Sequence, residues 1–419
     1  MRILYVSQYF PPEMGAPAAR VMELSRHWVV QGHDVTVLTG FPNHPTGRLA
    51  AAYRKKLRQL VMKDKVDGIN VVRTWLLPFP NRKPYERILN YSSFCFSAAL
   101  TGVFLSRPDV VIATSPQLLV GLSGWWLARL KRAPLVFEVR DLWPESLVAV
   151  GMGTQVSMLH RALTVIANFL YRKSDKIVVV TPAFKDHLIR LGVPGSKISV
   201  VQNGVETNLF DPHRQGPNVK RNLGLAGKFV VSYIGTMGIA HGLEKVLESA
   251  AQLRQSNPEI QFLFVGEGAN KQKIISLARS TKLKNVRFVD EQARERIPDY
   301  IAASDICLVL LKNSEVFKTV IPTKMLEFMS CARPVILGVD GQARKILEEA
   351  EAGLFVRPEN AGDLTAAILK LAANPELRTE LGRNGRKFIL QYFSRPQTAR
   401  AYMQFLESFV KKETRAIAA

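Results

Sequence analysis

Short apolar runs alternate with longer helical stretches through the first half of the chain. The runs Arg2–Ser7 and Asp34–Thr39 have the composition of buried strands, and the segment Ala18–Val30 between them has the pattern of a helix. Three further runs repeat the strand pattern: Asp109–Ala113, Leu135–Val139 and Lys176–Val180. Strands that alternate with helices predict βαβ units and a parallel sheet.

The second half restarts the same pattern. A strand at Phe229–Ile234 leads into the glycine-rich turn Gly235–Gly238 and a helix at Leu243–Arg254. Four more strands are predicted at Gln261–Val265, Val286–Val289, Ile306–Leu310 and Pro334–Leu337. The sequence therefore predicts an α/β protein of two Rossmann-like domains. Open sheets of this kind bind ligands at the carboxyl ends of their strands, and we expect those ends to face one cleft.

The boundary between the two domains is expected in the polar, turn-rich stretch Asn203–Pro212. We predict a first domain over residues 1–205 and a second over residues 206–392. An amphipathic helix, roughly Pro396–Lys411, is predicted beyond the last strand within the tail 393–419, and we expect it to cross back to the first domain.

Composition narrows the class of protein. A chain of 419 residues with 47% hydrophobic content can bury two cores. The three cysteines, Cys95, Cys307 and Cys331, form no metal-like cluster and cannot all pair, which indicates a reducing compartment. The N-terminus runs straight into a strand, so we expect no signal peptide.

Charge is unevenly distributed along the chain. Of the net charge of +22, residues 1–200 contribute 26 basic and 12 acidic residues, or +14. The basic residues cluster at Arg54, Lys55, Lys56, Arg58, Lys63 and Lys65, and again at Arg82, Lys83 and Arg87. No nucleic-acid-binding module or interleaved aromatic residues accompany them, so we expect no nucleic-acid partner. An anionic membrane surface attracts such clusters, and the alternative is a solvated basic surface.

One segment bears on that choice. Residues Ile88–Ser106 contain no charged residue and reach the length of a membrane-spanning helix. Polar residues dilute the segment, which favours a buried or interfacial helix over a span.

Two glycine turns follow predicted strands of the second domain. Gly235, Gly238 and Gly242 surround the first turn, which also holds Thr236 and His241; the second contains Gly266, Glu267 and Gly268. Glycine permits positive φ and lets the backbone approach a pyrophosphate. A tight turn without a ligand is the alternative.

The segment Lys318–Ile336 carries the strongest candidate site. A helix from about Pro322 to Ser330 offers free N–H groups and a dipole to an anion, and Lys324 adds a full positive charge. Glu327 lies one turn further, where its carboxylate can accept hydrogen bonds from a ribose diol. The alternative is an ordinary surface Lys–Glu pair.

The first domain offers two further strand ends. A loop containing Gly15 opens the first helix, and it lacks the GxGxxG dinucleotide fingerprint. After the strand Leu135–Val139, Arg140, Asp141 and Glu145 bring several charged groups to one edge, which favours a site over a single structural ion pair.

The chain resembles the large retaining glycosyltransferase family 4, which has the GT-B fold, and the matching stretches occur in the family's order. The resemblance rests on RILYVSQYFPPEMGAPAAR, VVQNGVETNLF, YIGTMGIAHGLEKVLESA, FLFVGEGANKQKI, RFVDEQARERIPDYIAASDICLV and IPTKMLEFMSCARPVI, which span nearly the whole chain. The stretches FEVRDLWPES and KTVIPTKMLEFM resemble the branch of WbuB-like L-fucosamine transferases.

The resemblance assigns roles to individual residues. Glu327 matches the second Glu of the family's E-x7-E motif, which holds the donor ribose, while the first Glu falls at Thr319. Gly235 matches the phosphate-turn glycine, but the usual Arg and Lys fall at Thr236 and His241. The family's His-Asp pair falls at Arg140 and Asp141. We infer that Arg140 and Lys324 supply the missing positive charge and that Asp141 is catalytic with them. The expected donor-binding residues are Gly15, Gly235, Thr236, Gly238, His241, Gly266, Glu267, Thr319, Pro322, Thr323 and Glu327.

The resemblance implies a retaining glycosyltransferase of bacterial surface polysaccharide synthesis. We expect a UDP-linked donor, with an N-acetylated deoxyhexosamine such as L-FucNAc as a candidate sugar, and a lipid-linked saccharide acceptor. No cofactor or metal is expected, because no DxD-like carboxylate pair follows a strand. We expect a cytoplasmic protein held peripherally on the inner face of the membrane. The alternatives are a GT-B-fold nucleotide-sugar epimerase and a non-catalytic assembly partner.

Overall fold

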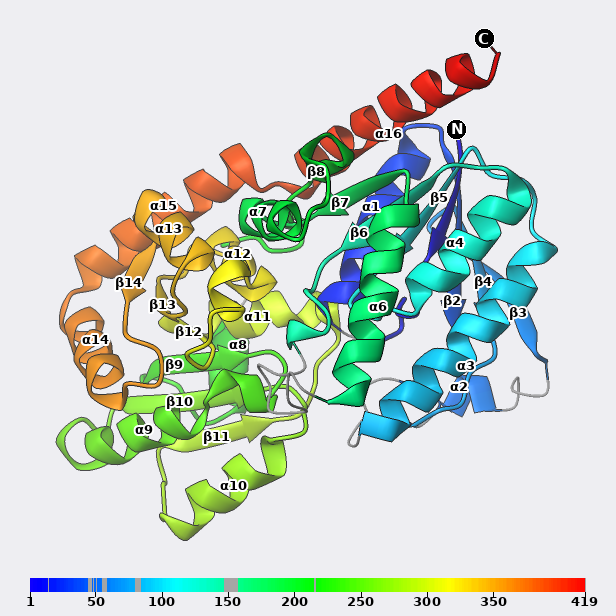
Figure 1. The fold of residues 1–419 in the computed structure, drawn as a ribbon. Helices are drawn as coiled ribbons and strands as arrows, with labels where there is room; N and C mark the ends of the chain where they lie inside the picture. Colours follow the sequence, from blue (N-terminus) through cyan, green and yellow to red (C-terminus); the bar gives the residue numbers. More distant parts are fainter. Residues whose placement is uncertain are drawn as a thin grey trace. The chain divides into compact units, whose positions relative to one another are not determined.

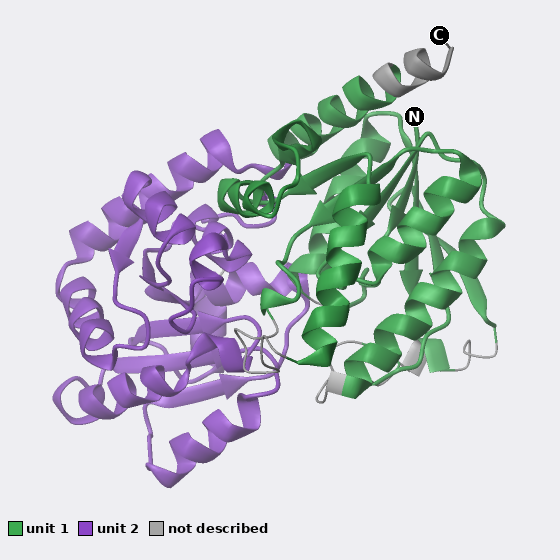
Figure 2. Cartoon of the chain, viewed as in Figure 1, with its two compact units in different colours: residues 1–202, 396–419 green, residues 203–395 purple. Residues whose placement is uncertain are grey.

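The chain forms two compact units. A computed structural model describes residues 1–13, 15–43, 47, 49, 51–54, 59–79, 84–146, 157–214 and 216–418. Unit 1 comprises Met1–Gln202 with Pro396–Ala419, and unit 2 comprises Asn203–Arg395 (Figure 2). Of the predicted basic clusters, Lys55, Lys56, Arg58, Arg82 and Lys83 lie outside the described residues.

Unit 1 is built on an eight-stranded sheet (Figure 1). Its strands are β1 (Arg2–Val6), β2 (Asp34–Gly40), β3 (Val61–Val66), β4 (Ile69–Thr74), β5 (Val110–Thr114), β6 (Leu135–Val139), β7 (Lys176–Val179) and β8 (Ile198–Val200). They lie in the order β3-β4-β2-β1-β5-β6-β7-β8. All neighbours are parallel except the hairpin β3–β4. The strand order reverses between β1 and β5, which is where ligands of such sheets bind.

Helices cover this sheet, and the last of them comes from the C-terminus. They are α1 (Ala16–Val30), α2 (Ala51–Arg54), α3 (Pro84–Val103), α4 (Val120–Lys131), α6 (Met158–Lys173), α7 (Pro182–Arg190) and α16 (Arg395–Ala418). Trp28 of α1 is fully buried, and its indole N–H donates to the Ala399 carbonyl (3.0 Å). Its ring meets Tyr402 edge-on at 5.3 Å. The predicted return of the last helix to the first domain is therefore confirmed.

Unit 2 is a six-stranded, wholly parallel sheet. Its strands are β9 (Phe229–Ile234), β10 (Ile260–Val265), β11 (Val286–Val289), β12 (Ile306–Leu310), β13 (Val335–Gly338) and β14 (Gly353–Phe355). The order is β11-β10-β9-β12-β13-β14, with the reversal between β9 and β12. Side chains of β9 pack on both faces of the sheet. Val230 and Ile234 belong to one core layer, and Val231 and Tyr233 belong to the other.

Eight α-helices enclose the two faces of this sheet within the described part of unit 2. They are α8 (Gly216–Asn222), α9 (Glu244–Ser256), α10 (Lys271–Ser280), α11 (Ile297–Ala302), α12 (Thr323–Ser330), α13 (Gln342–Glu349), α14 (Ala361–Ala373) and α15 (Pro375–Tyr392). The predicted helix after Pro322 is α12, which begins at Thr323 with Pro322 as its N-cap residue.

The uncharged segment Ile88–Ser106 lies largely in α3, which ends at Val103. One side of α3 packs inward, with Phe94 and Ala98 fully buried. In the described part of the chain, no helix has the length and apolar character needed to cross a bilayer.

Candidate functional site

The two glycine turns of unit 2 lie against each other. Gly235 directly follows β9, and its N–H donates to the Val265 carbonyl at the end of β10 (2.9 Å). Gly235, Gly266 and Gly268 have φ values of 133°, 140° and 155°. A Cβ on Gly266 would lie 2.1 Å from the Gly235 carbonyl oxygen. Only glycine allows this backbone approach, which brings the two turns together at one edge of the sheet.

Gly266→Ala should therefore destabilise unit 2. The new methyl group meets backbone that cannot swing aside, so we expect a loss of about 3 kcal/mol in urea unfolding. Gly227→Ala is the matched control, because Gly227 also has positive φ (72°) but has no atom near its Cβ position. Its cost should stay near 1 kcal/mol, the usual penalty of a left-handed alanine. Equal losses in the two variants would contradict the packing argument.

Lys324 lies beside the first of these turns. Its Nζ donates to the Tyr233 hydroxyl (2.8 Å) and lies 4.0 Å from the centre of the Tyr233 ring. A Cβ on Gly235 would lie 3.4 Å from the same nitrogen. Burial of the ammonium group lowers the pKa of Lys324 to about 7. This cation is thus held close to the glycine turn in a poorly solvated place, where it interacts strongly with an anion.

His241 is neutral at this turn. Its Nδ1 lies 3.3 Å from the Gly238 N–H, which can donate to it. Burial, together with the charge of Lys324, lowers the pKa of His241 to about 3. The positive charge at the turn therefore comes from Lys324.

Glu327 lies one turn further along α12 and is buried, with 8% of its surface exposed. Its Oε1 accepts a hydrogen bond from the Arg294 guanidinium (3.0 Å), which also stacks over the Phe210 ring at 5.0 Å. The alternative of a surface Lys–Glu pair is wrong, because Lys324 bonds to Tyr233 and Glu327 bonds to Arg294. The bond to Arg294 fixes the position of this carboxylate, and a carboxylate can accept hydrogen bonds from a diol.

Thr319, Pro322 and Thr323 lead into the same helix. Thr319 ends a short 3₁₀ turn, Phe317–Thr319, and its hydroxyl donates to the Val316 carbonyl (2.6 Å). Pro322 provides no side-chain hydrogen bond to the first turn of α12. Thr323 and Lys324 are the first two helical residues, so the N-terminal end of the helix dipole lies next to the buried cation.

Glu267 lies in the second turn but is engaged in an ion pair. It accepts from Lys271, which also bonds to Asp290 (2.5 Å). The Lys271 side chain is 4% exposed, and although burial alone would lower its pKa, the bonds to Asp290 and Glu267 raise it. Lys271 thus links the loop after β10, which holds Glu267, to the loop after β11, which holds Asp290.

In unit 1 the structure brings Gly15 and Arg140 together. The Arg140 guanidinium donates to the carbonyls of Ala16 (3.1 Å) and Pro17 (3.3 Å), directly after Gly15. Asp141 accepts a hydrogen bond from Ser146, and burial raises the pKa of its carboxyl group. Arg140 thus braces the first turn of α1.

A buried ion pair lies beneath these residues. Glu138 is completely buried and pairs with Arg20 at 2.8 Å. Burial opposes its ionisation, but Arg20 and Arg140 lower its pKa. The hydroxyls of Tyr5 (2.8 Å) and Thr114 (2.6 Å) also donate to Glu138. Arg20, Tyr5 and Thr114 thus fix the end of β6, after which Arg140 and Asp141 follow.

Sequence reasoning missed Tyr233 and Arg294, the partners of Lys324 and Glu327. Tyr233 has the pattern of an ordinary core residue of a strand. Arg294 lies in the charged loop after β11, and its place at a carboxyl strand end was the available signal.

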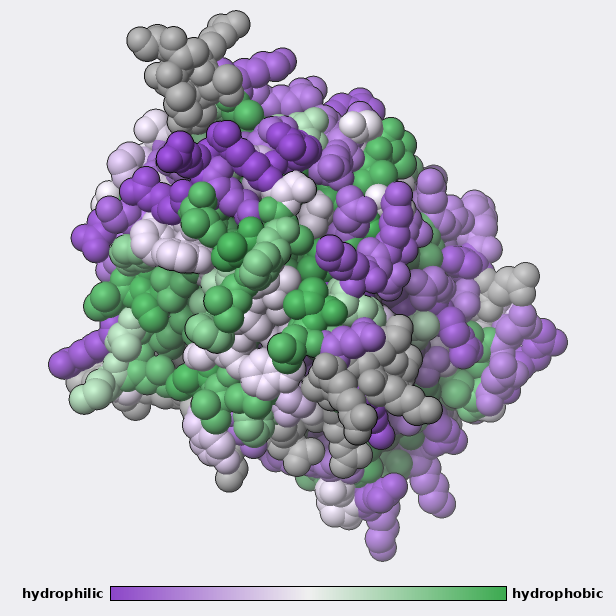
Figure 3. Space-filling view, turned by 90° about the vertical axis from the view of Figure 1, so that its right-hand side faces the viewer, coloured by the Kyte–Doolittle hydropathy of each residue, from purple (hydrophilic) through white to green (hydrophobic). Residues whose placement is uncertain are grey.

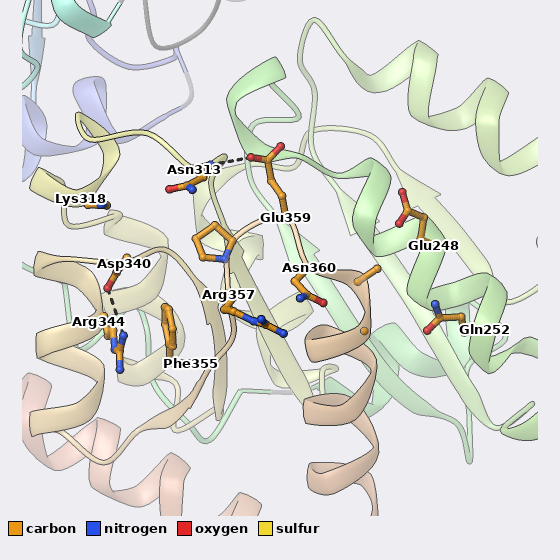
Figure 4. A pocket seen from close by; sticks show the side chains of 13 residues that line it. Glu248, Gln252, Asn313, Lys318, Asp340, Arg344, Phe355, Arg357, Glu359 and Asn360 are labelled. Carbon is orange, nitrogen blue, oxygen red and sulfur yellow. Dashed lines mark hydrogen bonds and ion pairs between the residues drawn. The ribbon is translucent and has the colours of Figure 1, made fainter.

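A hollow of about 780 Å³ in unit 2 lies elsewhere (Figure 4). Its lining includes Asn313, Asp340, Arg344 and Arg357. None of the predicted site residues belongs to this lining. Its charges are satisfied locally, since Arg344 pairs with Asp340 and Arg357 with Asp363. We therefore assign the candidate site to the glycine turns and α12.

Comparison with known families decides the class of protein. Residues 15–204 match the glycosyl transferase 4-like domain, and residues 217–388 match glycosyl transferases group 1. The chain is a glycosyltransferase of this group. The match favours the transferase over the epimerase alternative.

Two relatives match the chain over most of its length. It is 24% identical over 399 residues to the colanic acid biosynthesis glycosyl transferase WcaI of Escherichia coli K12, covering 90% of this chain and 94% of that protein. It is 22% identical to glycogen synthase of Mycobacterium tuberculosis, covering 96% and 94%.

Among solved structures, sucrose-phosphate synthase from Thermosynechococcus elongatus superposes with a TM-score of 0.76 at 21% identity, covering 98% of this chain and 99% of that one. Anabaena HepE in complex with UDP-glucose gives 0.74 at 18% identity, covering 97% and 100%. The predicted two-domain GT-B fold is confirmed.

Proposed function

We propose that this glycosyltransferase moves a sugar from a UDP-linked donor to a lipid-linked saccharide acceptor in bacterial surface polysaccharide synthesis. The observation that carries the proposal is the buried Lys324 cation beside the Gly235 turn, with Glu327 one helical turn away. This arrangement suits a diphosphate next to a ribose. The solved complexes of HepE with UDP and with UDP-glucose support the choice of donor.

The proposed role of each site residue follows from its charge and its position. Lys324 and the amides of Thr236 and Thr323 stabilise the diphosphate, on which negative charge grows as the sugar leaves, and Gly238 provides the turn. Glu327, held by Arg294, accepts from the ribose hydroxyls. Gly266, Glu267, Thr319, Pro322 and His241 shape the pocket, with His241 as a neutral hydrogen-bonding group.

Unit 1 is proposed to take the acceptor. Arg140 and Asp141 are the candidates for contact with the reacting sugar, and Gly15 opens the helix beside them. Retention at the anomeric carbon is proposed from the resemblance to glycosyltransferase family 4. An N-acetylated deoxyhexosamine such as L-FucNAc is proposed from the resemblance to the WbuB-like branch. The name of WcaI assigns that relative to colanic acid biosynthesis, which supports a polysaccharide pathway here.

A lipid-linked acceptor implies work at a membrane surface. We propose peripheral attachment to the cytoplasmic face through unit 1, where most of the net charge of +22 resides.

A thermal-shift screen of nucleotide sugars tests the donor assignment, because a ligand that binds only the folded state raises its melting temperature. UDP-sugars should stabilise the protein more than ADP-, GDP- or CMP-sugars. Stabilisation by another nucleotide class alone would overturn the choice of UDP.

UDP affinity should weaken as pH rises above about 7. The free protein binds a proton at Lys324 with a pKa of about 7. Since the diphosphate favours the charged amine, binding raises that pKa, so affinity is full below 7 and falls as the amine deprotonates above it. Titration calorimetry between about pH 7 and 9 avoids the phosphate's own titration near 6. Lys324→Met should lack this slope, and a flat wild-type profile would contradict the role of Lys324.

A further inference from the structure

The outward face of α3 is mostly apolar, whereas the outward face of a solvated helix is polar. Its exposed side chains recur every three or four residues: Tyr85, Ile88, Leu89, Ser92, Phe96, Leu100 and Val103. All but Ser92 are large and apolar or aromatic, and Phe96 is 66% exposed. Phe104, just beyond the helix, is 89% exposed. A solvated helix normally presents polar residues on this face.

Neighbouring helices extend this apolar surface. Gly102 lets α3 approach Leu127 of α4 closely, and Trp125 of α4 meets Phe169 of α6 edge-on at 5.0 Å. On α4, Trp126 and Leu130 are about half exposed, at 48% and 47%. On α6, Met158 and Val165 are exposed. Figure 3 shows a broad hydrophobic area on one side of the molecule, bordered by hydrophilic residues. Contiguous apolar surface of this kind marks an interaction site.

An apolar groove of about 390 Å³ opens within this surface. It is lined by Ser92, Cys95, Phe96, Ala99, Leu119, Leu122, Ser123 and Trp126. Its walls come from α3 and from the start and middle of α4. The groove can hold a hydrocarbon chain and offers little to a charged or sugar ligand.

Most of the charged side chains around this surface are basic. Its exposed cations are Arg107, Arg129, Arg132, Arg161, Arg172 and Lys173. On α3, α4 and α6, the sole acidic residue is Glu86, which is half-buried. A bilayer with anionic headgroups offers both complements at once, hydrocarbon for the apolar face and negative charge for the arginines.

We propose that the face formed by α3, α4 and α6 docks on an anionic bilayer, with Phe96, Phe104 and Trp126 inserted among the acyl chains. This deepens the proposed function, on which it rests for the lipid nature of the acceptor. Insertion is shallow, since a helix in this surface lies in the plane of the interface. The α3–α4 groove takes part of one lipid chain, and the arginines contact the headgroups.

Flotation with vesicles of phosphatidylglycerol and phosphatidylcholine tests the proposal. The wild type should float with these vesicles at low salt. The triple variant Phe96→Ser, Phe104→Ser, Trp126→Ser should lose binding by about 1,000-fold, because each of the three large apolar side chains contributes about tenfold. Arg129→Glu with Arg132→Glu should weaken binding at low salt and have little effect at high salt. Leu390→Ser is the matched control, since Leu390 is 46% exposed on α15 of unit 2.

Trp126 provides an independent readout. It is the exposed tryptophan among the chain's five, all of which are described. Its fluorescence should shift to the blue on vesicle binding, and Trp126→Phe should abolish the shift.

Equal flotation of the triple variant and the wild type would overturn the proposal. So would a wild type that does not float and instead forms a dimer lost in the triple variant, which would assign the face to a second copy of the chain. UDP binding is measured on the same proteins. Its retention in the triple variant shows that the donor site is intact, while its absence from the wild type would count against the proposed function and leave the membrane result unaffected.

Discussion

Lys324→Met should lower kcat by about 100- to 1,000-fold, the usual effect of removing one group that stabilises charge developing in a transition state. The leaving diphosphate gains negative charge as the bond to the sugar breaks, and the Lys324 ammonium is the buried cation next to the Gly235 turn. UDP affinity should fall less than kcat, because the charge is greater in the transition state than in bound donor. Steady-state kinetics with the best donor of the screen measures both.

The same variant provides its own folding control. Burial holds the pKa of Lys324 near 7 in the folded state, below the usual value near 10.4 of an unfolded chain. A lowered folded pKa means that the charged amine opposes folding, fully below about pH 7 and progressively less as pH rises toward the unfolded value. Lys324→Met should therefore melt no lower than the wild type at neutral pH. A variant with normal turnover would contradict the proposed role.

Glu327→Ala should weaken UDP binding by about 10- to 150-fold, the range expected for lost hydrogen bonds to a charged group. The change removes the ribose acceptor and also leaves the Arg294 guanidinium without this partner. Titration calorimetry with UDP measures the loss.

Two further variants separate these effects. Glu327→Gln keeps an acceptor oxygen and should lose less affinity. Glu315→Ala is the matched control, because Glu315 forms an exposed pair with Lys318 (2.6 Å) and should leave affinity unchanged. Unchanged UDP binding in Glu327→Ala would refute the ribose assignment.

Most strands could be predicted because they are buried apolar runs flanked by turns. The hairpin β3–β4 escaped prediction since its outer strand carries Lys63, Asp64 and Lys65, whose exposed edge position needs no apolar pattern. The three-residue strands β8 and β14 are too short to show a period. Their pairing is set by the sheet they complete.

The candidate site could be located from sequence, but its internal chemistry could not. The α12 N-terminus and the glycine turns follow from local patterns of proline, lysine and glycine. The bond from Lys324 to Tyr233 joins residues 91 positions apart, and that from Glu327 to Arg294 joins residues 33 apart. Such contacts, and the neutral state of His241, depend on tertiary packing that no local pattern encodes.

The sequence motifs and the geometry also differ in what they imply about Arg140. Its position after β6 predicts a catalytic cation. In the structure its guanidinium bonds to the carbonyls of Ala16 and Pro17, which holds the first turn of α1. Its catalytic role stays a prediction, and it competes with a structural role at the same strand end.

We propose that the site around Lys324 and Glu327 catalyses sugar transfer from a UDP-linked donor to a lipid acceptor. The most direct test incubates the purified protein with UDP-sugars and a bacterial lipid extract, and follows UDP release together with the mass of the lipid. We expect UDP release that depends on the extract, a lipid product heavier by one sugar residue, and loss of both in Lys324→Met. UDP binding without release or a heavier lipid, for every UDP-sugar and extract tried, would contradict the account and favour a non-catalytic assembly partner.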